Sequence, residues 1–168
     1  MGTKRQIFYS FHYDNDVFRV QQIRNIGALE DNKPVSANDW ETVKKGGDKA
    51  IEKWIDDTMK GRSCLVVLVG SDTSKRKWVD YEIRKAWDDG KGVLGIYIDD
   101  LVDPRYSKTP PFFGKSLRGT NPFNNISLKS GKVLSSIVKC YAPPPIDTYK
   151  NIAANLETWI EEAIKMRQ

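Results

Sequence analysis

Apolar residues occur along the chain with two spacings, one typical of strands and the other of helices. The runs QIFYSFHY at residues 6–13 and SCLVVLVG at residues 63–70 are rich in β-favouring residues. The second is apolar almost throughout, as expected of a strand covered on both faces. Residues 93–98 (VLGIYI) and 133–138 (VLSSIV) predict two further strands, and a weak signal near Val35 allows one more.

Between these runs, apolar residues recur every three to four positions, which predicts amphipathic helices. The expected helices cover residues 17–29, 48–60 and 78–89 and the region after Asp147. Residues 14–16 are expected to form a turn and the N-cap of the first helix, and Asp147 is expected to cap the last.

The alternation of strands and helices predicts an α/β fold of the flavodoxin-like, doubly wound type. We expect a mostly parallel sheet of about five strands flanked by helices, with residues 1–168 forming a single domain. Ligands of such sheets bind at the carboxyl ends of the strands, which directs attention to residues 10–16 and 70–77. The irregular, proline-containing segment 99–125 is long enough to predict a function of its own.

Composition supports a folded domain and restricts its partners only loosely. Hydrophobic residues make up 39% and charged residues 29% of the chain, which suffices for a core. The net charge of +5 suits an anionic partner such as a nucleotide or a nucleic acid. Because the basic residues are scattered among acids, a solvated surface is the simpler interpretation, and nucleic acid is disfavoured.

The cysteines and the lengths of the apolar runs indicate where the protein resides. Cys64 and Cys140 each lie in an apolar run, which predicts buried, reduced thiols, although the sequence leaves a disulfide open. No run approaches the roughly 18 apolar residues of a membrane span. We therefore expect a soluble, cytoplasmic protein without membrane contact.

Several common catalytic centres are excluded by the residues present. His12 is the only histidine, which rules out a multi-histidine metal site, and we expect no bound metal. The chain has neither a G-x-S-x-G elbow nor a G-x-G-x-x-G fingerprint, and FGKS at residues 113–116 lacks the first glycine of a P-loop. Asp14, Asp16 and Asp72 imitate the acidic centre of a response-regulator receiver only loosely, because their spacing is poor.

Two segments, residues 7–13 and 71–83, remain as candidates. Trp78 and Glu82 are one helical turn apart and adjoin the apolar stripe of their helix, so Glu82 is expected to be partly buried beside the indole. A buried carboxylate is costly and therefore marks a candidate functional residue. Spacing alone favours the alternative of a surface glutamate paired with Arg84 or Lys85, just as it favours turn capping and core packing for the first segment.

The order of residues in both segments resembles the TIR-like family, in particular the bacterial Thoeris defence sensors of the ThsB type. Such domains typically carry an aromatic-Ser-aromatic motif on the first strand and a Ser…Trp-x-x-x-Glu segment on the helix after the third. The matching residues in FYSFHY and SDTSKRKWVDYE are Phe8, Ser10 and Phe11, followed by Ser74, Trp78 and Glu82. By motif, the resemblance covers about residues 6 to 100.

The resemblance implies an enzyme that cleaves the nicotinamide–ribose bond of NAD, with Glu82 as the catalytic residue. NAD is then the substrate, and no separate cofactor is expected. Stacking or hydrogen-bonding contacts with the substrate are expected from Ser10, Phe11, His12, Ser71 and Trp78. If water is excluded from the site, the product is a cyclic ADP-ribose isomer rather than ADP-ribose.

The resemblance also implies partners. A second protein, a nucleotide-sensing effector, is expected to read the signal in antiviral defence, and self-association is expected on activation. Two alternatives stay open: a non-catalytic TIR-like adaptor that acts by protein-protein contacts, and a nucleic-acid binder. The region that forms a mobile lid and assembly contact in TIR domains, here residues 32–47, carries no diagnostic motif.

Overall fold

The computed structural model describes residues 5–26 and 43–168, and in these the expected parallel sheet is present. Its four strands are hydrogen-bonded in the order β1-β2-β3-β4, all parallel. The strands are β1 (Ile7–Ser10), β2 (Cys64–Val69), β3 (Gly92–Tyr97) and β4 (Cys140–Tyr141). The long helices are α1 (Tyr13–Arg24), α3 (Asp48–Met59), α4 (Lys77–Asp88) and α5 (Thr148–Lys165).

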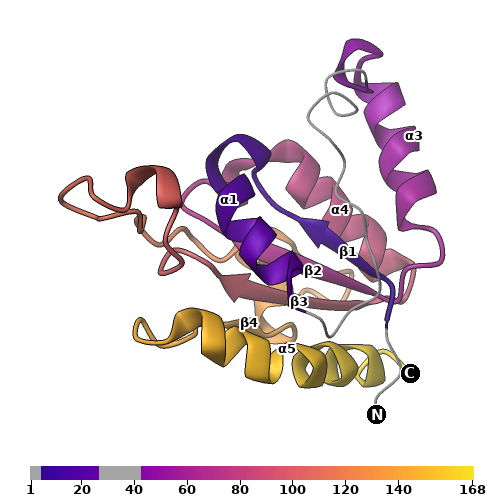
Figure 1. Cartoon of the computed structure of the whole chain (residues 1–168). Coiled ribbons are helices and arrows are strands. Elements are labelled where there is room, and N and C mark those ends of the chain that lie inside the picture. The colour runs from indigo at the N-terminus through magenta and orange to yellow at the C-terminus, as the bar shows by residue number, and fades with distance from the viewer. Residues whose placement is uncertain (1–4, 27–42) are drawn as a thin grey trace.

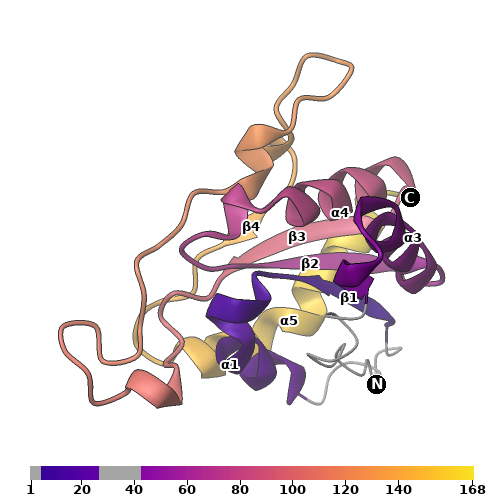
Figure 2. The ribbon, with the colours of Figure 1, turned by 90° about the horizontal axis from the view of Figure 1, so that it is seen from above.

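Helices cover both faces of this sheet, which confirms the doubly wound α/β class (Figures 1 and 2). Successive residues of a strand point to opposite faces, and β2 is buried along its whole length. Cys64, Val66 and Leu68 pack with α1 and α5, whereas Leu65, Val67 and Val69 pack with α3 and α4. An apolar run that lacks alternation therefore belongs to a central strand with two hydrophobic layers around it.

The amphipathic pattern of α4 positions the region of interest. Val79, Ile83 and Ala86 are buried against the sheet, as their spacing predicts. Glu82 lies on the same buried face, one position before Ile83. Burial of a side chain the size of Val79 or Ile83 contributes roughly 1.5 to 3 kcal/mol, so the packing of α4 fixes where Glu82 lies.

The start of the chain differs from the sequence-based expectation. β1 ends at Ser10, and α1 already begins at Tyr13, so residues 14–16 lie inside the first helical turn and do not form a cap. His12 is the N-cap residue, without a side-chain cap, and its carbonyl accepts a 3.0 Å hydrogen bond from the Asp16 backbone N–H. The Asp16 carboxylate pairs instead with Arg19, which explains why this capping residue type does not cap.

The strand expected at residues 133–138 is wrong. A 3₁₀ turn covers Leu134–Ser136, and Val133 before it forms one antiparallel bridge with Ser127. The fourth strand lies at Cys140–Tyr141. The hydroxyl of Ser136 donates to the Val133 carbonyl at 2.6 Å, which favours a turn over an extended chain. Leu134 and Val138 are buried from this turn, so the apolar pattern reflects core packing without a strand.

The expected cap at Asp147 is absent, whereas the two cysteines are free as expected. Asp147 precedes α5 but has a left-handed backbone (φ 60°) and makes no side-chain cap, because a capping residue needs an extended backbone. Cys64 is buried, Cys140 is half-buried, and both thiols are free, so no disulfide forms.

The strand proposed near Val35, and most of the lid region 32–47, lie outside the described residues. Among the described helices, none has the length and apolarity that a membrane span needs.

Candidate active site

A cavity of about 140 Å³ opens beside β1 and the first turns of α4. Phe11 and His12, in the connection from β1 to α1, form one part of its wall. Trp78, Val79 and Glu82 of α4 form another, and α3 contributes Trp54 and Thr58. The motif residues Phe8, Phe11, Trp78 and Glu82, which come from two distant segments, thus line one cavity together with His12.

Glu82 is the buried ionisable group of this cavity. Its side chain faces the sheet with only 9% of its surface exposed, and burial raises the pKa of its carboxyl group to about 8. The surface ion pairs considered from the sequence are not formed, because Arg84 pairs with Asp80 at 2.7 Å and Lys85 with Asp89 at 3.1 Å. Glu82 is therefore a buried carboxyl group on the wall of a cavity.

Ser10 lies behind the cavity wall and does not line the cavity. It is 1% exposed at the end of β1, on the strand face that packs against α4. Its hydroxyl lowers the pKa of Glu82, against the larger effect of burial. Within the described parts of the chain, neither Ser10 Oγ nor Glu82 Oε2 has a hydrogen-bond partner of regular geometry.

His12 and Phe11 line the cavity at the point where the chain leaves the sheet. Burial, and then the charge of Arg76, lower the pKa of His12, so its ring is neutral near pH 7. Its Nδ1 atom is buried and has no hydrogen-bond partner among the described residues. Phe11 also packs against the core beneath α1, with its ring centroid 6.1 Å from that of Tyr13. Phe11 therefore packs in the core, as the first interpretation expects, and also lines the cavity, while its stacking on a substrate stays a prediction.

Trp78 and Ser71 have different outcomes. Trp78 lines the cavity half-buried and meets the ring of Tyr81 edge-on at 5.6 Å. Ser71 does not line the cavity. The segment after β3 crosses the end of β2 there, and Gly119 lies so close to the carbonyl oxygens of Gly70 and Ser71 that a side chain at position 119 would clash. The structure therefore unites Trp78 with Glu82 but leaves Ser71 apart from them.

Basic side chains on the cavity wall were not among the predicted site residues. Arg24, Lys44, Arg62 and Arg76 line it, against Asp14 and Glu82 as its acids. These cations come from four separate parts of the sequence, so no local motif marks them. Their one visible signal is the KRK run before Trp78, which contains Arg76. Among the described lining residues, basic side chains thus outnumber acidic ones, which favours an anionic ligand.

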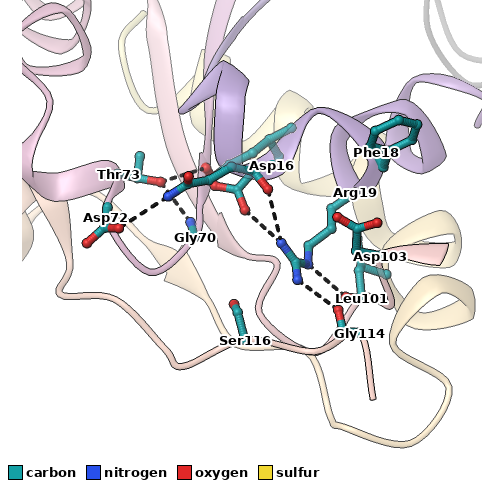
Figure 3. Close-up of polar contacts among 12 residues, drawn as sticks. Asp16, Phe18, Arg19, Gly70, Asp72, Thr73, Leu101, Asp103, Gly114 and Ser116 are labelled. Carbon is teal, nitrogen blue, oxygen red and sulfur yellow. Dashed lines mark hydrogen bonds and ion pairs between the residues drawn. The ribbon is translucent and has the colours of Figure 1, made fainter. Parts of the chain in front are cut away.

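A second buried polar cluster ties α1 to the long segment after β3 (Figure 3). Arg19 is 6% exposed and donates to Asp16 Oδ1 at 3.0 Å, to the Leu101 carbonyl at 2.9 Å and to the Gly114 carbonyl at 2.7 Å. Burial raises the pKa of Asp16 to about 6, and a side chain at Gly70 would collide with its carboxylate. Asp16, one of the three acids that resembled a receiver centre, therefore serves a structural ion pair.

Asp72, in the loop after β2, contacts α1 near this cluster. Asn15 donates to its carboxylate at 3.2 Å, and Lys75 pairs with it at 3.4 Å. In the ranges 5–26 and 43–168, no three His, Cys, Asp or Glu side chains gather as they do around a metal ion. Asp16 in α1 and Asp72 after β2 are thus held by nitrogen donors.

The fold and the cavity together define a TIR-like α/β domain: a parallel sheet, a helix after its central strand that carries a buried glutamate, and a serine beneath that glutamate at the end of the first strand. The family model described as "Thoeris protein ThsB, TIR-like domain" matches residues 8–103, more than half of the chain. The chain belongs to this family.

A curated relative has a more specific name. It is the protein called "Putative cyclic ADP-D-ribose synthase ThsB1" from Bacillus cereus (strain MSX-D12), which is 35% identical over 125 residues. The matched region covers 71% of this chain and 62% of the relative. The chain thus spans less than two thirds of the length of that relative.

Proposed function

We propose that this protein cleaves the nicotinamide–ribose bond of NAD and releases a cyclic ADP-ribose-type signal in Thoeris antiviral defence. The observation that carries the proposal is Glu82, a buried carboxyl group that has no counter-ion among the described residues and lies on the wall of a cavity at the carboxyl end of β1. Family membership and the name of the Bacillus relative support it.

The chemistry needs an anion at this position. When the C1′–N bond to nicotinamide breaks, its electron pair leaves with the pyridine nitrogen, and positive charge develops on the ribose. The ionised form of Glu82 stabilises that charge in a site with little water. Because the nicotinamide of NAD is already cationic, it leaves as a neutral molecule and no general acid is required. The neutral His12 beside the cavity is consistent with this mechanism.

The size and lining of the cavity suggest how NAD is oriented. Ligand pockets commonly measure about 300 to 1,000 Å³, and the cavity of about 140 Å³ is smaller. It therefore suits the nicotinamide–ribose end, with Phe11 and Trp78 beside the ring, while the adenosine end extends outside. An adenine nitrogen or a hydroxyl group of the same molecule can then attack C1′ in place of water, which closes a ring. A partner effector protein would read this product.

The test is turnover of NAD by the purified protein, with products separated by mass spectrometry, in the presence and absence of extract from infected cells. Glu82→Gln should lower turnover by about 100-fold or more, since it removes the anion and keeps the shape. Glu157→Gln, on the exposed face of α5, is the matched control and should leave turnover unchanged. Undiminished turnover in Glu82→Gln would refute the catalytic assignment.

An adaptor without catalysis is the second candidate, and one observation favours it. The long segment after β3 exposes Tyr106, Phe112 and Phe113, each about half accessible, although its backbone is held by Arg19. Exposed aromatic side chains on an ordered segment suit protein contacts. Self-association without any NAD-derived product, in the presence of infected-cell extract, would support the adaptor over the enzyme.

A further inference from the structure

Ser10 is placed differently from a substrate-binding residue. Phe8, two residues earlier on β1, packs with α3 and α4, and strand alternation puts Ser10 on the same face. Ser10 pairs in register with Val67 of the central strand and is 1% exposed. Glu82 lines the cavity, whereas the Ser10 side chain does not reach the cavity surface.

The polar atoms of the two residues are each without another described partner. Ser10 Oγ is buried without a regular hydrogen bond, and so is Glu82 Oε2. An unsatisfied buried donor next to an unsatisfied buried acceptor is rare in folded proteins, because both groups lose their hydration. The two groups belong to motifs that are far apart in the sequence, and the packing of β1 against α4 brings them together.

We propose that Ser10 is a positioning residue for Glu82, whose hydroxyl donates a hydrogen bond to the Glu82 carboxylate and holds that anion toward the cavity. A serine hydroxyl rotates freely about its Cβ–Oγ bond, so it can donate to the carboxylate when Glu82 ionises. This role replaces the ribose or phosphate contact expected from the sequence. The kinetic part of the inference rests on the proposed function, whereas the Ser10–Glu82 contact does not.

The electrostatics of the site leave room for this effect. Burial raises the pKa of Glu82 and Ser10 lowers it, and no other described group is a resolved cause of the shift. The other charged or titratable side chains that the structure describes on the cavity wall are Tyr9, His12, Tyr13, Asp14, Arg24, Lys44, Arg62 and Arg76. A hydrogen bond from Ser10 is therefore the specific interaction that favours the ionised form of Glu82.

The direct test is the titration of the Glu82 side-chain carboxyl carbon by NMR in the wild type, in Ser10→Ala and in Ser63→Ala. Ser63 precedes β2 at the far end of the sheet and serves as the matched control. Removing a hydrogen bond to a charged group should raise the midpoint for Glu82 by about one pH unit in Ser10→Ala. Ser63→Ala should titrate like the wild type.

Kinetics supply the second readout. In Ser10→Ala the turnover number should fall about tenfold at pH 7 and recover at a pH above the shifted midpoint, with KM for NAD unchanged. If Ser10 contacted the substrate, KM would rise and the titration of Glu82 would stay in place, and that pair of results would overturn the proposal. An unchanged titration in folded Ser10→Ala would overturn it as well.

Folding and the proposed function are controlled separately. If Ser10→Ala does not fold, Ser10→Cys keeps the volume with a weaker donor and should shift the titration in the same direction. The titration requires no NAD. A shifted Glu82 midpoint in a protein that cleaves no NAD would therefore uphold the Ser10–Glu82 contact and refute the proposed enzymatic function.

Discussion

Arg76 is the residue best placed to select a ligand with a diphosphate. It lines the cavity at the start of α4 and lies close enough to His12 to lower the pKa of that ring. The side chain is exposed and forms no ion pair with any residue described. The N-termini of α1 and α4 meet this part of the cavity without side-chain caps, and helix N-termini favour phosphate.

We therefore expect Arg76→Ala to weaken the binding of ADP-ribose by about tenfold, which corresponds to one charged hydrogen bond. Nicotinamide riboside, which has no diphosphate, should bind the variant and the wild type equally. Calorimetric titration of both ligands measures this difference. Lys75→Ala is the control, because Lys75 is adjacent in sequence, pairs with Asp72 and does not line the cavity. Equal weakening of both ligands would contradict a phosphate contact.

At the level of single residues, the sequence indicated Trp78 and Glu82 of the candidate site but not the basic residues of the cavity wall. Trp78 and Glu82 are one helical turn apart, so local periodicity placed them on one wall. The cations Arg24, Lys44 and Arg62 reach the same cavity through the tertiary fold, and no short pattern contains them. Ser71 shares the polar loop after β2 with Thr73, but the chain around Gly119 packs across the end of β2 and separates it from the cavity.

At the level of elements, the Arg19 cluster, formed by Arg19, Asp16 and the carbonyls of Leu101 and Gly114, joins α1 to a segment more than 80 residues away. Its guanidinium donates to the carbonyls of Leu101 and Gly114, which gives two backbone groups of that segment a buried partner. The same α1 begins directly after His12 on the cavity wall. The position of residues 99–116 and the position of the cavity wall thus both depend on α1.

Arg19→Met should lower the free energy of unfolding by about 3 to 5 kcal/mol, because it leaves the buried Asp16 carboxylate without its partner. Denaturant titration measures the loss. Amide hydrogen exchange at Asp103, whose N–H donates to the Gly114 carbonyl at 2.8 Å, should accelerate. Arg84→Met breaks an exposed pair with Asp80 and should cost less than about 1 kcal/mol. Equal losses in the two variants would show that the Arg19 cluster is not a structural tie.

The elements themselves were predictable where the pattern was local and regular. β2, β3, α3 and α4 follow directly from continuous apolar runs or helical spacing. The last strand was misplaced because Leu134 and Val138 are apolar for core packing while their backbone turns. The actual strand, Cys140–Tyr141, is two residues long, too short for periodicity to detect.

At the level of the whole molecule, two buried carboxyl groups link stability to pH. Burial raises the pKa of Asp16 to about 6 and that of Glu82 to about 8. At a pH above the ordinary pKa values of these carboxyl groups, the folded state therefore binds more protons than the unfolded state. Their stabilising contribution is present at low pH and is lost as the pH rises through these pKa values. His12, with a lowered pKa, acts in the opposite direction below about pH 6.5.

The free energy of unfolding should therefore fall by about 2 to 4 kcal/mol from pH 5 to pH 8.5, mainly through Glu82. Thermal and denaturant unfolding across this range measure the trend. Glu82→Gln, which stays neutral, should flatten it and be more stable than the wild type at pH 8.5 while losing turnover. Equal or lower stability of Glu82→Gln at pH 8.5 would show that burial of the charge is not what destabilises the protein.

The state of the two cysteines has a practical consequence. Burial raises the pKa values of Cys64 and Cys140 to about 12, so at neutral pH both remain thiols that react slowly with alkylating dyes. A third cysteine, introduced in place of the exposed Lys75, would be labelled selectively without removal of the native ones. The unmodified core thus permits a fluorescent reporter a few residues from the cavity mouth, through which ligand entry can be followed in real time.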